Sequence, residues 1–232
     1  MSGTRLSIIM PVLNEAATIE AAVKALAPYR ERGIELIVVD GGSRDGTPAR
    51  ARPFADHVCV ASRGRAVQMN VGRVAARGDV LLFLHADTRV PDNADALIIE
   101  GLAHSRRVWG RFDVRFDRGG LLTLVAAMMN LRSRLTGIAT GDQALFVTRT
   151  AFDAAGGFPP IPLMEDISLS KHLKRIGPPL CLRARITTSA RRWEANGTLR
   201  TILLMWRLRL AYFFGADPAR LARRYGYASA EQ

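Results

Sequence analysis

The chain has 232 residues and 48% of them are apolar, which is ordinary for a protein that buries a core. The net charge of +12 is not ordinary, and only three of the 33 basic residues are lysine. An anionic small ligand or an acidic membrane surface fits this charge. An arginine bias can reflect codon composition alone, so we do not expect nucleic acid as a partner. No segment reaches the ~20 consecutive apolar residues of a membrane-spanning helix.

The N-terminus and the cysteines indicate a cellular location. Residues 1–5 lead directly into an apolar segment, so we expect no signal peptide. Cys59 and Cys181 lie in apolar, strand-like runs without metal-ligand spacing, which favours core thiols over a disulfide. These features predict a cytoplasmic protein, with peripheral attachment to the inner face of a membrane as a further option.

Residues 1–105 alternate apolar strands with helices. Strands are predicted at 6–12, 34–39, 58–61 and 80–84, and helices at 16–26, from about 48, at 65–77 and at 94–104. Asn14 is a candidate N-cap for the first of these helices. This alternation is typical of a mostly parallel sheet with helices on both faces.

Residues 106–232 follow a different pattern. Alternating residues predict a strand over 108–116 with one solvated face. Further predictions are a helix at 121–135, a loop and strand over 141–148, a helix at 165–176, and short strands at 180–182 and 186–188. An amphipathic helix is predicted over 201–214, where Arg207 and Arg209 interrupt the apolar run; we expect it to pack on the domain in preference to a membrane. No linker or repeat is visible, so we expect a single domain, 1–232, with halves at 1–105 and 106–232.

The strand at 80–84 ends in an abrupt change of polarity. Five apolar residues are followed by His85, Asp87, Thr88 and Arg89. Ligands of open α/β sheets bind beyond the carboxyl ends of the strands. A His-x-Asp pair at this position is therefore a candidate contact for a ligand or a metal ion.

The loops after the first two strands carry further candidate residues. Asp40 is placed to accept hydrogen bonds from a base or ribose, although a turn-initiating aspartate is an equal reading. Glu15 has the alternative of a first-turn acid that interacts with the helix dipole. Neither G-x-G-x-x-G after the first strand nor G-x-x-x-x-G-K-[ST] is present, which disfavours dinucleotide and P-loop sites.

Six segments together resemble one known family. They are PVLNE (11–15), IVVDGGSRDGT (37–47), RAVQMNVGRVAARGDVLLFLHADT (65–88), TGDQALFV (140–147), GGFPPIPLMEDISLSKHLKRIG (156–177) and TTSARRW (187–193). In this order they resemble the inverting family 2 glycosyltransferases. The small bacterial subgroup of radical-SAM- and selenodomain-associated transferases is the most similar. The resemblance implies a GT-A-type three-layer α/β/α sandwich with a mostly parallel central sheet.

The resemblance also implies site residues. Those on the nucleotide-sugar side are Pro11, Val12, Asn14, Glu15, Asp40, Asp45, Arg65, Asn70, Ala86 and Asp87. Those on the acceptor side are Asp142, Gln143, Glu165, Arg192 and Trp193. Asp166 takes the position of the catalytic base, and the first-turn acid that favours a helix dipole is its structural alternative. Gln143 and Asp142 have turn formation as an equal reading, and Trp193 has a core role.

His85-Ala86-Asp87 takes the place of the Asp-x-Asp metal motif of the family. Asp87 is expected to hold a Mn²⁺ or Mg²⁺ ion that neutralises the leaving diphosphate, with His85 as a second candidate ligand. The motif departs from the family because His85 replaces an aspartate. Ser189 stands where the glutamine of a Gln-x-x-Arg-Trp motif is found, which weakens any inference to a processive polymerase.

The expected function is metal-dependent transfer of a sugar, with inversion, from a nucleotide-diphosphate sugar to an acceptor hydroxyl. A UDP-linked donor is favoured, and the acceptor is open. One alternative is a sugar-phosphate nucleotidyltransferase, although PVLNE lacks the glycine-rich basic loop of such enzymes. A non-catalytic basic module that docks on a membrane or on nucleic acid is the other.

Overall fold

The computed structural model describes residues 5–227, apart from the side chains of Arg192 and Asn196. The strands are β1 Leu6–Val12, β2 Glu35–Asp40, β3 His57–Val60, β4 Val80–Phe83, β5 Thr88–Arg89, β6 Trp109–Phe116, β7 Phe146–Thr148 and β8 Leu180–Thr188. The α-helices are α1 Ile19–Lys24, α2 Ala27–Glu31, α3 Thr47–Ala51, α4 Arg65–Ala75, α5 Ala94–Ser105, α6 Leu121–Thr136, α7 Arg149–Ala154, α8 Glu165–Ile176, α9 Arg191–Asn196, α10 Thr198–Phe213 and α11 Pro218–Tyr225. Short 3₁₀ turns lie at Arg52–Phe54 and Gly141–Gln143.

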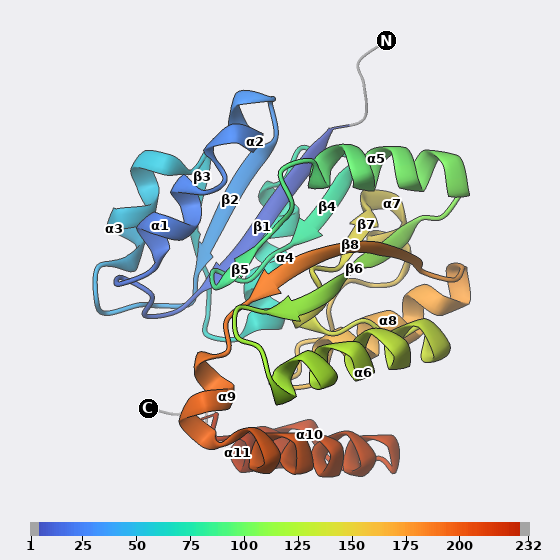
Figure 1. The fold of residues 1–232 in the computed structure, drawn as a ribbon. Helices are drawn as coiled ribbons and strands as arrows, with labels where there is room; N and C mark the ends of the chain where they lie inside the picture. The colour runs from blue at the N-terminus through green and yellow to red at the C-terminus, as the bar shows by residue number, and fades with distance from the viewer. Residues whose placement is uncertain (1–4, 228–232) are drawn as a thin grey trace.

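One eight-stranded sheet runs through both halves of the chain (Figure 1), in the order β3-β2-β1-β4-β7-β6-β8-β5. The pairs β1–β2, β1–β4, β2–β3 and β6–β8 are parallel, and β4–β7, β6–β7 and β5–β8 are antiparallel. This arrangement confirms the predicted mostly parallel α/β sheet. Because β4 lies next to β7, the His85–Asp87 turn after β4 faces segments of the second half.

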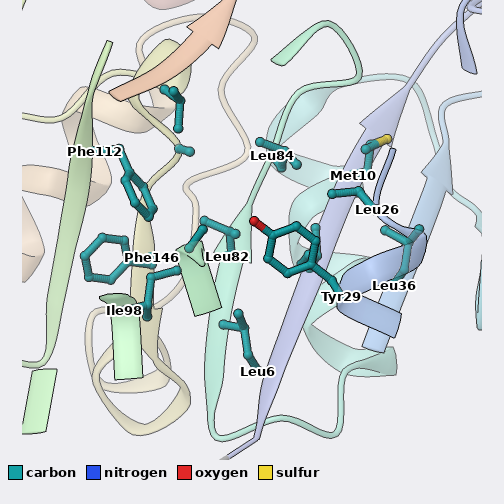
Figure 2. Packing of buried hydrophobic residues seen from close by; sticks show 14 of the residues in the cluster. Leu6, Met10, Leu26, Tyr29, Leu36, Leu82, Leu84, Ile98, Phe112 and Phe146 are labelled. Atoms are coloured by element: carbon teal, nitrogen blue, oxygen red, sulfur yellow. The ribbon is translucent and has the colours of Figure 1, made fainter. Parts of the chain in front are cut away.

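Alternating side chains of the buried strands supply two separate hydrophobic layers. On one face, Met10 of β1 and Leu36 of β2 pack with Leu26 and Tyr29, as Figure 2 shows, and α5 and α6 continue this layer. On the other face, residues of β1, β2 and β4 pack against α4, α7 and α8. Helices therefore cover both faces of the sheet, as the three-layer prediction requires.

Helix α4 lies unusually close to the sheet because Gly72 has no side chain. A Cβ atom on Gly72 would be 2.3 Å from Cγ2 of Ile9 in β1. The first residue of this helix is Arg65.

The predicted solvated face of the strand at 108–116 is correct for Arg115, which is exposed, and wrong for two other polar residues of the strand. Arg111 and Asp113 of β6 are buried and paired with each other, because α6 covers this face. Arg111 also donates to the hydroxyl of Ser133 and to the carbonyl of Asn130, both in α6. A polar residue in an alternating pattern need not reach water when a neighbouring helix supplies its partners.

Two other predicted elements have different bounds. The strands at 180–182 and 186–188 are one continuous strand, β8, which pairs with β6 across a register shift between Phe112 and Asp113. The helix at 16–26 is only α1, and the separate helix α2 follows it. Asn14 is not its N-cap: its φ of 53° places it in a left-handed turn outside the helix.

The C-terminal helices pack on the rest of the protein. Leu208 of α10 and Leu221 of α11 form a small core with Leu163, Met164 and Ile167, which surround the start of α8. The expected packing of the C-terminal segment is therefore confirmed. None of the helices in residues 5–227 is long and apolar enough to span a membrane.

The two cysteines are both free thiols and lie only partly buried. Burial raises the pKa of the Cys59 thiol above its ordinary value. They form no disulfide with each other, as expected, although neither is in the fully buried core.

Candidate active site

The loops after β1 and β2 are tied together by backbone and side-chain hydrogen bonds. The N–H of Asn14 donates to Oγ of Ser43 (2.7 Å), and Oδ1 of Asn14 accepts from the N–H of Arg44 (3.0 Å). The N–H of Ala16 donates to Asp45 (2.9 Å), so Asp45 braces this pair of loops. The loop that the sequence assigned to the nucleoside is thus a preformed, rigid edge.

Asp40 is buried at the tip of β2 and makes an Asx-type turn. Its carboxylate accepts from the N–H groups of Gly42 and Ser43, at 2.9 and 2.8 Å. The turn reading of Asp40 is therefore correct, although a carboxylate has capacity for further hydrogen bonds. Glu15 likewise acts within its own loop, where its carboxylate accepts from the hydroxyl of Thr18 (2.5 Å).

A buried glutamine that sequence reasoning missed holds the ends of β1 and β2. Nε2 of Gln68, on α4, donates to the carbonyls of Val12 and Val39, both at 2.8 Å. Pro11 and Val12 are themselves buried in β1. The only signal was a single polar residue on the apolar face of the predicted helix at 65–77.

The His85–Asp87 turn joins β4 to β5 at the carboxyl edge of the sheet. The N–H of Thr88 donates to the carbonyl of His85 (3.1 Å), which closes the turn. Asp87 is exposed, and its carboxylate accepts one long hydrogen bond from the Thr88 hydroxyl (3.3 Å). Ala86 lies half-buried between them. Most of the hydrogen-bonding capacity of Asp87 is therefore available to a ligand.

Gly141 lies between the His85–Asp87 turn of the first half and Asp166, the candidate base in the second half. A Cβ atom on Gly141 would lie 2.9 Å from Cε1 and Nε2 of His85, so the imidazole ring rests on this glycine. The N–H of Gly141 donates to Oδ2 of Asp166 (2.8 Å). Oδ1 of Asp166 accepts from the N–H of Ile167 (2.7 Å). Asp166 is thereby held as an oriented carboxylate at the start of α8.

The electrostatic environment of His85 favours a neutral ring. Burial lowers the pKa of His85 below its ordinary value of 6.5, and the guanidinium of Arg65 lowers it further. The carboxylates of Asp142, Asp87 and Asp166 oppose this shift. All four of these charged groups are predicted site residues, and the structure brings them around one imidazole.

A partly buried ion pair joins the two halves beside this cluster. Nη2 of Arg65 lies 2.8 Å from Oε1 of Glu165, whose side chain is buried. Burial raises the pKa of the Glu165 carboxyl, and Asp166 adds to the shift. Burial by itself lowers the pKa of Arg65, but the attraction of Glu165 outweighs it, so Arg65 remains charged.

Three predicted site residues make structural contacts within the protein. Both atoms of the Asn70 side-chain amide bond the backbone of Phe158 (2.8 and 3.0 Å), which links α4 to the loop before α8. Gln143 is buried and closes a capping box with Thr140. Trp193 packs edge-on against Phe116 with ring centroids 5.4 Å apart. The side chain of Arg192 lies outside the described residues.

Two arginines near Asp166 were not predicted as site residues. Arg132 comes from α6 and Arg209 from α10, and both carry buried guanidinium nitrogens. Other polar residues, such as Arg134 and Arg207, stand close to them in the same helices, so no pattern in the sequence distinguished these two. The sequence placed Arg209 merely as an interruption of the C-terminal helix.

The site thus combines an exposed carboxylate at a strand tip, an oriented carboxylate at a helix start, and surrounding arginines. No group of three or more acidic, cysteine or histidine side chains within residues 5–227 is arranged to hold a metal by itself. Such a site suits a ligand that brings its own oxygen donors and negative charge.

Comparison with known proteins finds similar glycosyltransferases. Glucosyl-3-phosphoglycerate synthase of Mycobacterium tuberculosis is 35% identical over 98 residues, which cover 37% of this chain and 30% of that protein. Glycosyltransferase AglE of Haloferax volcanii is 34% identical over 90 residues, or 35% of this chain and 30% of that protein. The matched region therefore spans less than a third of the length of these relatives.

Solved structures show the same fold. The M. tuberculosis glucosyl-3-phosphoglycerate synthase in complex with Mn²⁺, UDP and glucosyl-3-phosphoglycerate has a TM-score of 0.64 at 21% identity, covering 98% of this chain and 82% of that one. TarS 1–349 of S. aureus has a TM-score of 0.65 at 17% identity, covering 80% of this chain and 60% of that one. The fold is that of the GT-A glycosyltransferases. The model of the family "Glycosyl transferase family 2" matches residues 7–158, and the chain belongs to this family.

Proposed function

We propose that the protein transfers a sugar, with inversion, from a nucleotide-diphosphate sugar to an acceptor hydroxyl. The observation that carries this proposal is the convergence of two carboxylates on one ring. Asp87 of the strand-tip turn and Asp166 of α8 both act on His85, which rests on Gly141. One carboxylate is exposed toward a ligand, and the other is oriented by a backbone N–H.

The donor side is formed by the tied loops after β1 and β2 and by the His85–Asp87 turn. UDP is the favoured nucleotide, because the structural relatives named above hold UDP or, for TarS, UDP-GlcNAc. Asp45 keeps the Asn14 loop in place, so the edge needs little reordering when a nucleoside binds.

Asp87 would hold a divalent cation, with His85 as a second ligand. One exposed carboxylate and one neutral imidazole are too few ligands to complete the coordination of a metal ion with protein atoms alone. They suit Mg²⁺ or Mn²⁺ when a diphosphate and water complete the coordination. When bound, such an ion neutralises the charge that develops on the leaving diphosphate.

Asp166 acts as the general base. It accepts the proton of the acceptor hydroxyl while the oxygen forms its bond to the anomeric carbon. The bond from that carbon to the diphosphate oxygen breaks, and its electron pair leaves with the diphosphate. The Gly141 N–H holds the accepting carboxylate in position, so the base has a fixed direction.

A nucleotide panel tests the donor side. Thermal unfolding is followed with UDP, GDP, ADP and dTDP, each with and without Mn²⁺, because a ligand that binds only the native state raises its apparent stability. We expect UDP with Mn²⁺ to give the largest shift and Asp87→Asn to reduce it. A flat panel would contradict the proposal.

Asp166→Asn tests the base. The asparagine retains the size of the side chain and can still accept from the Gly141 N–H, but it cannot take up the proton. We expect transfer to fall by about 10²–10⁴-fold while binding of UDP with Mn²⁺ stays within about twofold. Full transfer activity in this variant would remove Asp166 from the mechanism.

The outer face of α10 supports peripheral membrane attachment as an additional property. Trp206 and Phe213 are 63% and 74% exposed. They belong to an apolar stripe that also contains Leu199, Leu203 and Leu210. Exposed arginines of α10 and α11 flank this stripe, namely Arg200, Arg207, Arg220, Arg223 and Arg224. Such a face is suited to the headgroup region of an anionic membrane.

A further inference from the structure

Arg132 and Arg209 hold unpartnered N–H groups inside the protein. Nε and Nη2 of Arg132 and Nε of Arg209 are shielded from solvent and have no hydrogen-bond acceptor among the described residues. Neither guanidinium forms an ion pair with a carboxylate in this part of the chain. A guanidinium N–H that is buried without an acceptor is costly, so this arrangement requires a reason.

The electrostatic surroundings of the two arginines disfavour their charged forms. Burial lowers the pKa of Arg132 to about 10, and repulsion by Arg209 adds to the shift. Burial also lowers the pKa of Arg209. Asp166 and Asp142 oppose both shifts, so they lie close enough to attract the guanidinium groups but do not pair with them.

Arg111 and Arg65 have acceptors among the described residues, which distinguishes them from Arg132 and Arg209. Arg111 pairs with Asp113 and donates to Ser133 and Asn130. Arg65 pairs with Glu165 at 2.8 Å. Where an arginine has a structural role, this fold therefore supplies acceptors for it.

The position of the two arginines indicates the acceptor side of the site. Arg132 belongs to α6 and Arg209 to α10, both in the second half of the chain. Leu208, next to Arg209 in α10, packs in one small core with Met164 at the start of α8, the helix that carries Asp166. The carboxylate of Asp166 raises the pKa of both arginines, which agrees with this placement. The two arginines therefore belong to the half of the chain that carries the proposed base.

We propose that Arg132 and Arg209 form an oxyanion subsite for the acceptor, which carries a phosphate monoester near the hydroxyl that receives the sugar. This inference rests on the proposed function. Guanidinium groups bind phosphate with paired, charge-assisted hydrogen bonds. Two cations match the dianion of a phosphate monoester better than the single charge of a carboxylate. The phosphate would supply the acceptors that the protein withholds, and it would orient the acceptor toward Asp166.

Calorimetric titration tests the subsite on the full chain saturated with UDP and Mg²⁺, so that the donor diphosphate site is occupied. Inorganic phosphate and glycerol 3-phosphate are the probes, at constant ionic strength. We expect saturable binding that weakens at least tenfold in Arg132→Gln and in Arg209→Gln. Arg207→Gln is the matched control, because it removes an exposed arginine from the same helix. UDP affinity should stay within twofold in all three variants.

The outcomes distinguish failure of the subsite from failure of the proposed function. Phosphate binding that is equal in wild type and in both Gln variants overturns the subsite. A Gln variant that loses affinity for UDP as well as for phosphate also overturns it, because the arginines would then belong to the donor site. A wild type that binds no UDP instead contradicts the proposed function. If a Gln variant does not fold, the unfolding temperature of the wild type is measured in phosphate and in chloride of equal ionic strength. The subsite is rejected unless the unfolding temperature is higher in phosphate.

A water-soluble, short-chain phosphatidic acid identifies the source of the phosphate. It carries the same monoester as glycerol 3-phosphate with added apolar chains. Binding at least tenfold tighter than that of glycerol 3-phosphate, and dependent on Arg209, indicates a lipid acceptor. Equal binding of the two probes indicates a small soluble one. Both results support the oxyanion subsite, whereas binding of the lipid that is unaffected by Arg209→Gln contradicts it.

Discussion

Arg65 and Glu165 form an ion pair of 2.8 Å that connects the first residue of α4 with the first residue of α8. Glu165 is buried, and its second oxygen, Oε2, has no hydrogen-bond partner among the described residues. This carboxylate therefore depends on Arg65 for its charge compensation. The pair fixes the helix start that carries Asp166 relative to the nucleotide half.

Removal of Arg65 is expected to expose this dependence. Arg65→Ala leaves a buried carboxylate without a counter-charge, and we expect a loss of about 3 kcal/mol in the free energy of unfolding. The double variant Arg65→Ala/Glu165→Gln should recover part of this loss, because the uncompensated charge is gone. Urea denaturation measures both values. Equal losses of the free energy of unfolding in the single and double variants would show that Arg65 does not compensate the charge of Glu165.

The same variant has a predicted pH dependence. Burial raises the pKa of the Glu165 carboxyl above 4.5, and removal of Arg65 leaves this effect unopposed. When pH falls, a carboxyl whose pKa is raised in the folded state is protonated in the folded protein at a higher pH than in the unfolded chain. Proton uptake therefore stabilises the folded state as the pH is lowered from neutral. We expect the deficit of Arg65→Ala relative to wild type to be smaller at pH 5 than at pH 8. A deficit that grows on acidification would contradict the assignment.

Gly141 allows a direct test of the contact between the two halves. A methyl group from Gly141→Ala would meet the His85 ring at 2.9 Å and displace it or the loop that supports Asp166. We expect the rate of UDP release from the sugar donor to fall by at least tenfold, because a misplacement of reacting groups by about 1 Å lowers the reaction rate by about 10²-fold. Gly119→Ala is the control, because nothing lies within 4 Å of its added methyl. Similar activity in the two variants would separate His85 and Gly141 from the chemistry.

The elements near the site show what sequence patterns can and cannot predict. The strand at 80–84 and the helix at 165–176 were predicted because apolar runs and periodicity are local signals. The resemblance supplied Asp87, Asp142 and Asp166, and the structure brings them around His85. Their mutual placement depends on the β4–β7 pairing, which joins residues more than 60 positions apart.

The wrong or missing predictions share one physical cause: tertiary partners decide what a polar residue does. Arg111 was assigned to solvent, but α6 buries it. The contacts of Asn70 with the backbone and of Gln143 in a capping box were not predicted, because they also depend on tertiary neighbours. Arg132 and Arg209 were left out, because one-dimensional periodicity does not reveal that their guanidinium nitrogens are buried without acceptors.

The unpartnered state of Arg132 predicts a gain in stability on its removal. Burial lowers the pKa of Arg132 to about 10 in the folded protein, which corresponds to a cost of about 3 kcal/mol at neutral pH. This cost is present while the guanidinium is charged in both states and disappears only as pH rises above about 10. We therefore expect Arg132→Met to raise the unfolding temperature of the ligand-free protein. Destabilisation comparable to that of a paired arginine such as Arg111→Met would show that Arg132 has partners after all.

The exposed stripe of α10 predicts binding to anionic vesicles. Trp206 and Phe213 project from the face opposite Leu208, which is buried against the protein. The double variant Trp206→Gln/Phe213→Gln should lower partitioning into phosphatidylserine-containing vesicles by at least tenfold, since each buried CH₂ contributes about 0.8 kcal/mol. The unfolding temperature should remain unchanged, because neither side chain belongs to the core. Sedimentation with vesicles measures the partitioning.

Val74→Gln is the matched control for this stripe, because Val74 is equally exposed but lies on α4, away from the C-terminal helices. It should not affect sedimentation. High salt should weaken binding by screening the flanking arginines, while the residual binding should still depend on the two aromatic residues. Sedimentation that is abolished by salt and indifferent to Trp206 and Phe213 would assign binding to net charge alone. Equal losses in the control and in the double variant would also remove the stripe as the attachment surface.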